Sequence, residues 1–123
     1  MSAEEEIELA RKYVNLSNRY ELEMVFRMFD ENAVYHSNYV GSFKGLVAIS
    51  TMMREFFARH TDVRWVVDKY SISKKGGVEF DFVRRNSDPE SGKETSGRGR
   101  ERIVFNDTGL IMKIEVDTFK SRP

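Results

Sequence analysis

The spacing of apolar residues changes near the middle of this 123-residue chain, and that change limits its fold more than any other feature. Before His60 most apolar residues recur at the spacing of an amphipathic helix, and after it they alternate with polar residues. The first pattern places side chains on one face of a helix, and the second places them on one face of a strand. The sequence therefore predicts helices followed by a sheet, packed as the layers of an α+β domain.

Three helices are predicted. The first covers residues 4–18, where an apolar stripe runs along the segment and an acidic start suits the helix dipole. A shorter second helix covers residues 20–29 and ends at the turn-forming residues 30–32. The third covers residues 46–60 and is expected to be well buried because its apolar face is broad.

A short hairpin is predicted before the third helix and four strands after it. The hairpin joins residues 33–37 to residues 39–43 and is closed by Gly45. Strict alternation marks the four later strands. Their centres are residues 63–68, 78–82, 101–105 and 112–117.

The connections between the later strands favour antiparallel pairing. Residues 75–77 and 106–109 contain glycine, which supplies the positive φ that tight hairpin turns require. Residues 86–99 are polar and carry a proline, so they predict a longer, mobile connection between two strands.

Three arginines, Arg98, Arg100 and Arg102, share one face of a predicted strand. Acidic residues occupy the polar faces of the neighbouring strands, where they could pair with the arginines across the sheet. The pattern favours a solvated outer face with ion pairs, and the alternative is an anion-binding arginine cluster. The acidic residues are Glu79, Asp81, Glu115 and Asp117.

Composition narrows the classes of protein. A length of 123 residues and a hydrophobic fraction of 40% predict one domain, residues 1–123, with one core. Twenty basic and twenty acidic residues cancel, so charge gives no reason to expect a nucleic-acid partner or an anionic membrane. The start of the chain lacks the pattern of a signal peptide, and the chain contains no cysteine, so a cytoplasmic location is expected.

Several segments resemble the NTF2-like superfamily, in particular its SnoaL-like and ketosteroid isomerase-like members. The resembling segments are residues 12–15, 21–25, 28–37 and 40–45. The order of helix, short helix, hairpin, helix and four-stranded meander agrees with that family. The resemblance implies a cystatin-like cone, in which three N-terminal helices pack on a curved, mainly antiparallel sheet and leave a pocket between the layers.

The resemblance to the ketosteroid isomerases also implies site residues. Tyr13 falls where that family has an oxyanion-binding tyrosine, and Glu101 falls where it has a protonated aspartate that donates a second hydrogen bond. Ser37, however, falls where the family has its catalytic base, and a serine hydroxyl without its own base does not abstract protons near neutral pH. A steroid-type isomerase is therefore not expected.

Each catalytic candidate has a structural alternative. Tyr13 could simply pack in the core, and Glu101 could pair with a neighbouring arginine. His36 is the third candidate, as a general base that replaces the one lost at Ser37. If Tyr35 and Ser37 face the pocket, however, His36 faces away, and only a shift of one residue in register would reverse this.

The expected ligand-binding residues are mostly aromatic, and the same residues could instead be ordinary core. Two distant histidines and no cysteine make a metal site improbable, and no cofactor is expected. The candidates for ligand binding are Tyr35, Ser37, Tyr39, Phe56, Trp65, Phe80 and Phe82.

Two functional hypotheses follow from the resemblance. The first is a cofactor-free isomerase, cyclase or dehydratase acting on a small apolar or aromatic carbonyl compound. The second is a non-catalytic ligand-binding or dimerisation module. The resemblance also implies a homodimer formed through the sheet, and neither nucleic acid nor membrane is expected as a partner.

Overall fold

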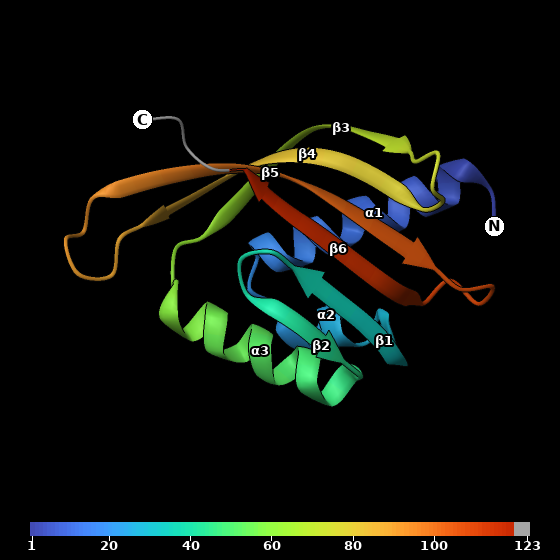
Figure 1. The fold of residues 1–123 in the computed structure, drawn as a ribbon, viewed down its shortest axis with the longest axis horizontal. Coiled ribbons are helices and arrows are strands. Elements are labelled where there is room, and N and C mark those ends of the chain that lie inside the picture. Colours follow the sequence, from blue (N-terminus) through green and yellow to red (C-terminus); the bar gives the residue numbers. More distant parts are fainter. Residues whose placement is uncertain (120–123) are drawn as a thin grey trace.

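Six strands form one sheet in the part of the chain that the computed structural model describes, residues 1–119 (Figure 1). The strands are β1 (Phe29–Ser37), β2 (Gly41–Lys44), β3 (Arg64–Ile72), β4 (Val78–Ser87), β5 (Glu94–Phe105) and β6 (Ile111–Phe119). Their order is β2-β1-β6-β5-β4-β3, so β2 and β3 lie at the edges. Only the pair of β1 and β6 is parallel, and the predicted mainly antiparallel sheet is confirmed.

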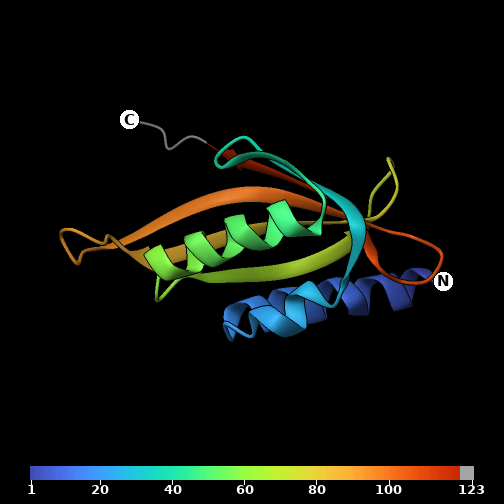
Figure 2. The same cartoon turned by 90° about the horizontal axis from the view of Figure 1, so that it is seen from below.

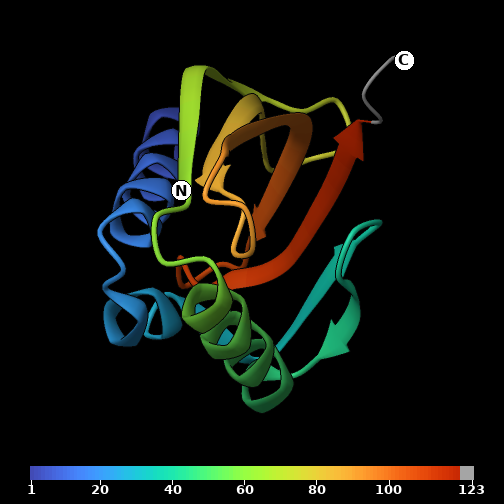
Figure 3. The ribbon, with the colours of Figure 1, turned by 90° about the vertical axis from the view of Figure 1, so that its left-hand side faces the viewer.

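Three helices accompany the sheet: α1 (Ala3–Asn18), α2 (Leu22–Phe26) and α3 (Leu46–Arg59). Figures 2 and 3 show a curved sheet with α1 beside β3 and α3 across from β1 and β2. Only α1 and α2 precede every strand, because α3 follows the β1–β2 hairpin. None of the helices in residues 1–119 is long and apolar enough to cross a membrane.

The first helix begins where its sequence supplies a cap. The Ser2 hydroxyl accepts a hydrogen bond from the Glu5 backbone N–H at 3.1 Å, and the Glu5 carboxylate accepts one from the Ser2 backbone N–H at 3.1 Å. This capping box satisfies two of the backbone donors that a helix start leaves free. It fixes the start of α1, the helix that carries Tyr13.

The predicted boundary between the second helix and the first strand was wrong. The helix ends at Phe26, and β1 already begins at Phe29, so residues 30–32 lie in a strand and do not form a turn. Long-range pairing explains the difference: Phe29 pairs with Ile111 of β6, and the Ile111 N–H donates to the Met28 carbonyl at 2.7 Å. The pairing register of β1 with β6 shifts between Phe29 and Val34, and the polar residues 30–32 lie within this irregular stretch.

The polar segment 86–99 is mostly strand, which corrects the prediction of a long connection. β4 continues to Ser87 and β5 starts at Glu94, and the two strands pair without interruption over this stretch. A β-ladder needs only backbone groups, so paired strands can continue through a polar stretch where most of the side chains are not buried. The remaining turn is held by the Asp88 carboxylate, which accepts from the backbone N–H groups of Glu90 and Ser91 at 2.8 and 2.9 Å.

The outer face of β5 carries the predicted ion pairs. Arg100 donates to Asp81 on β4 at 2.7 Å, and Arg102 donates to Glu115 on β6 at 2.6 Å. The interpretation of this face as paired charges is confirmed for these two arginines. Residues of the opposite parity on β5 point to the concave face, where the functional candidates lie.

Candidate functional site

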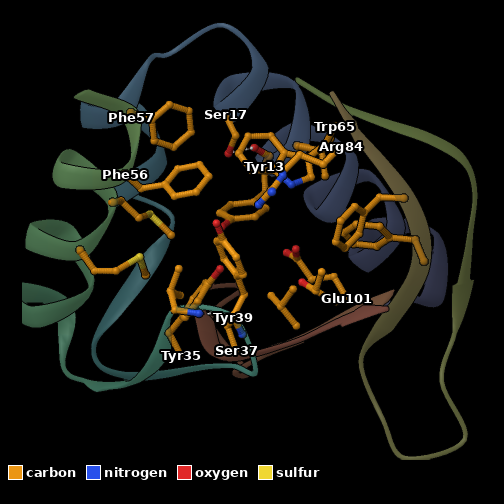
Figure 4. Close-up of a pocket in the computed structure, with 18 residues that line it drawn as sticks. Tyr13, Ser17, Tyr35, Ser37, Tyr39, Phe56, Phe57, Trp65, Arg84 and Glu101 are labelled. Carbon is orange, nitrogen blue, oxygen red and sulfur yellow. Dashed lines mark hydrogen bonds between the residues drawn. The ribbon is translucent and has the colours of Figure 1, made fainter. Parts of the chain in front are cut away.

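A cavity of about 70 Å³ lies between α1, α3 and the concave face of the sheet (Figure 4). Its wall is mainly apolar, with a few polar groups, which is the usual make-up of a small-molecule site. Every helix or strand except α2 and the edge strand β2 contributes to it. The lining residues are Tyr13, Val14, Ser17, Tyr35, Ser37, Tyr39, Val40, Met52, Met53, Phe56, Phe57, Trp65, Phe80, Phe82, Arg84, Glu101, Val116 and Thr118.

Glycine on the inner face of β5 helps to keep this space open. Gly99 pairs with Phe82 of β4, and a Cβ atom at Gly99 would lie 2.5 Å from the Phe82 ring and 2.8 Å from the Asp117 carbonyl oxygen. The Phe82 ring therefore occupies space that any other residue at Gly99 would need. Without the glycine, that ring would have to move.

Glu101 is the one carboxyl group among the lining residues of the described chain. It is 7% exposed, and its Oε2 has no hydrogen-bond partner within residues 1–119. Burial raises the pKa of Glu101 to about 8, because the charged form would lose its hydration. The carboxyl group is therefore mostly protonated at neutral pH and can donate a hydrogen bond.

Two tyrosines face the same space as Glu101. Burial raises the pKa of Tyr13 well above its usual value, and the negative charge that Glu101 acquires on ionisation raises it further. The pKa of Tyr35 is raised by the same two causes. Both phenols therefore keep their protons at neutral pH and can act as donors.

Ser37 holds the turn that follows β1. Its hydroxyl oxygen accepts from the backbone N–H groups of Tyr39 and Val40 at 3.0 and 3.3 Å, and the residue is 3% exposed. These bonds leave the hydroxyl hydrogen free to donate. They also fix the position of Tyr39 at the edge of the cavity.

The aromatic wall is anchored through the backbone of Trp65. The Asn18 side chain, at the end of α1, donates to the Trp65 carbonyl and accepts from the Trp65 N–H, both at 2.8 Å. The indole ring then packs 6.0 Å from the Phe56 ring and 5.7 Å from the Phe57 ring, measured between centroids. Trp65 is the only tryptophan of the chain, so it reports on the cavity directly.

A family model described as a SnoaL-like domain matches residues 10–114, which include every cavity-lining residue except Val116 and Thr118. The chain belongs to the SnoaL-like family. No curated protein matches the sequence significantly. The match confirms the family that the resemblance indicated.

Solved structures of low sequence identity share the fold of this SnoaL-like protein. An NTF2-like protein of unknown function from Exiguobacterium sp. 255-15 is 14% identical, with a TM-score of 0.81, covering 92% of this chain and 99% of that one. A proposed polyketide cyclase from Xanthomonas campestris pv. campestris is 14% identical, with a TM-score of 0.80 and coverage of 94% and 90%. TerC, co-crystallised with polyporic acid, is 11% identical, with a TM-score of 0.78 and coverage of 94% and 92%. The α+β fold with its curved sheet is thus NTF2-like.

The structure of the SnoaL-like domain brings nine of the ten predicted site residues to the cavity wall. Tyr13 and Glu101 face it from α1 and β5, and the seven candidates for ligand binding surround them.

His36 is the exception. It is exposed on the outer side of β1, where its Nδ1 atom contacts the Ser42 hydroxyl of β2. The alternation of the strand explains this, because Tyr35 and Ser37 on either side face inward. A general base at His36 does not fit this geometry.

Arg84 is the charged lining residue that was not predicted from the sequence. It follows Phe80 and Phe82 at the spacing of two along β4, so it shares their inward face. This spacing of two was the feature of the sequence from which the inward position of Arg84 could have been predicted. No cluster of three or more potential metal ligands occurs within residues 1–119.

Proposed function

We propose that this SnoaL-like protein binds a small, ring-shaped carbonyl compound in the cavity and promotes a cofactor-free proton transfer on it. Isomerisation, cyclisation and dehydration all begin with such a step. Glu101 would act as the general acid, and the phenols of Tyr13 and Tyr35 would hold the substrate oxygen. The aromatic rings around them would contact the rest of the ligand.

The observation that carries the proposal is the state of Glu101. A buried carboxyl group with a free oxygen is destabilising unless a ligand or water satisfies it. Its pKa of about 8 lies near the working pH, where a general acid is most effective. A carbonyl oxygen that accepts from Glu101 and from a phenol would also be stabilised as negative charge develops on it.

Two structural relatives support this ligand class. One is a proposed polyketide cyclase, and another was co-crystallised with polyporic acid. Both descriptions involve small organic molecules rather than macromolecules.

A binding protein without turnover is the second candidate. Among the residues that line the cavity in the described chain, Glu101 is the only carboxyl group and there is no histidine. A reaction that needs a separate base would therefore depend on water. Ligand binding alone needs only the donors and the aromatic wall.

Titration with acetophenone, followed by Trp65 fluorescence, tests the proposal. A ligand of this size is expected to bind with a Kd on the order of 1 mM. Tyr13→Phe should weaken binding about tenfold, since a hydrogen-bond donor is lost. Tyr70→Phe is the matched control, because Tyr70 does not line the cavity.

Exchange of the methyl protons of acetophenone in D₂O, followed by NMR, separates the two candidates. Acceleration by the wild type but not by Glu101→Gln supports the enzyme. Binding without exchange supports the binding protein, and absence of binding rejects both.

We further propose that the chain acts in the cytoplasm and forms a homodimer through the outer face of its sheet. Exposed apolar residues on this sheet, such as Val66 and Phe119 at 52% and 41% exposure, support such a contact. Light scattering on the purified chain should give twice the monomer mass.

A further inference from the structure

A groove of about 850 Å³ lies on the surface next to the cavity and shares part of its wall. Five residues line both spaces: Tyr39, Val40, Met52, Phe56 and Arg84. We call Tyr39, Phe56 and Arg84 the throat. A cavity of about 70 Å³ is smaller than the roughly 150 Å³ that accepts benzene in an engineered protein. A ring-sized ligand therefore has to extend into the throat.

Arg84 brings a positive charge to this throat. Its guanidinium carbon lies 5.0 Å from the centroid of the Tyr39 ring and 5.9 Å from that of the Phe56 ring. Contacts with ring faces hold the guanidinium in place without using its N–H groups as hydrogen-bond donors. Figure 4 shows Arg84 extending toward the same space as Tyr13 and Glu101.

Arg84 lacks a compensating carboxylate in the described chain. None of the ion pairs within residues 1–119 includes it, and its buried Nε atom has no hydrogen-bond partner there. Arg100 and Arg102 on the neighbouring strand are both paired. Glu101 does not supply the missing charge at neutral pH, because burial raises its pKa to about 8.

A carboxylate is the group that satisfies these conditions. It neutralises the guanidinium and can accept two parallel hydrogen bonds from it, a geometry that an arginine held by two rings presents in advance. The groove beyond the throat carries mixed charges, with Glu55, Asp88 and Glu90 beside Arg59. The preference for an anion is therefore local to Arg84.

We infer that the natural ligand is a ring-shaped organic acid whose carboxylate binds Arg84 in the throat while its ring enters the cavity. This inference rests on the proposed function, because the ring occupies the same cavity. It adds the charge of the ligand and the residue that selects for it.

A pair of isosteric probes tests the inference: benzoate, which is anionic, and benzamide, which is neutral. Both are titrated against Trp65 fluorescence in the wild type and in Arg84→Met, which keeps an apolar stem but removes the charge. Arg84→Lys retains the charge without the planar fork. Arg85→Met is the matched control, because Arg85 is the next residue of β4 and does not line the cavity.

The expected result is tighter binding of benzoate than of benzamide by the wild type. Arg84→Met should weaken benzoate about tenfold to a hundredfold, the usual effect of losing a charged hydrogen bond. The same substitution should leave the affinity for benzamide unchanged, which also shows that the variant is folded. The affinity of Arg84→Lys for benzoate should lie between those of the wild type and Arg84→Met. Arg85→Met should bind both probes as the wild type does.

Three results would overturn the inference. If benzamide binds as tightly as benzoate, or if Arg84→Met weakens both equally, then Arg84 only closes the throat, and the proposed binding of neutral ring compounds still stands. If acetophenone, benzamide and benzoate all fail to bind the wild type, the proposed function fails and the inference with it.

Discussion

The ionisable side chains on the two faces of β5 differ in whether they have partners. On the outer face, Arg100 and Arg102 each have a carboxylate partner on a neighbouring strand. On the inner face, Glu101 lies between them in sequence and has an oxygen without a partner in residues 1–119. The alternation of a strand thus separates charged groups paired on the outer face from a buried carboxyl group on the inner face whose Oε2 atom has no partner in residues 1–119.

The largest effect expected from this comparison is on stability as a function of pH. Because the pKa of Glu101 is raised to about 8 in the folded state, its contribution is fully present below its unfolded pKa of about 4.5 and is lost as pH rises to about 8. The free energy of unfolding of the wild type should fall by up to about 4 kcal/mol relative to Glu101→Gln over that range. Urea unfolding at several pH values measures it.

Asp81→Asn provides the control for this pH series, because it removes an acid from the outer face of the neighbouring strand. Between about pH 5 and pH 8, its free energy of unfolding should change with pH in parallel with that of the wild type. Parallel curves for Glu101→Gln and the wild type would show that Glu101 is ionised in the folded protein.

A smaller effect is expected at the glycines of the inner face. Gly99→Ala should destabilise the fold by about 2 kcal/mol and push the Phe82 ring into the cavity, since the new methyl group overlaps that ring. Gly97→Ala is the matched control, because nothing lies within 4 Å of a Cβ atom there. Thermal unfolding measures the stability of both variants, and acetophenone titration measures their binding. Equal losses of stability in Gly99→Ala and Gly97→Ala would mean that close packing does not require Gly99.

The smallest effect is expected on the outer face. Arg102→Met should cost about 1 kcal/mol, because the Arg102 side chain is only 13% exposed and also donates to the Gly76 carbonyl at 2.9 Å. Arg100→Met should cost less, since its ion pair is exposed to solvent and screened by salt. Neither should change acetophenone binding. A change in binding would contradict the separation of the two faces.

Local pattern predicted most of the fold. The helical period located α1 and α3, and the alternation located the later strands, because burial on one face leaves a direct mark on the sequence. The start of β1 and the polar ends of β4 and β5 were missed. These depend on pairing between distant backbone segments, such as Phe29 with Ile111, and side-chain type says little about such pairing.

The site was predicted unevenly for a related reason. The family resemblance indicated Tyr13 and Glu101, and strand parity argued that His36 faces away from the pocket. Arg84 and Arg85 look equivalent in the sequence, and only the inward phase of Phe80 and Phe82 separates them. Whether a charged residue has a partner is a property of the tertiary structure.

The clamp between Asn18 and Trp65 also affects how the protein meets other chains. An edge strand normally offers its free N–H and C=O groups to any strand that approaches, which is a route to aggregation. At Trp65 on edge strand β3, the amide of Asn18 already occupies both groups. The Asn18 side chain therefore prevents a further strand from pairing with β3 at Trp65. The contact that anchors this part of the cavity wall also opposes aggregation through the sheet edge.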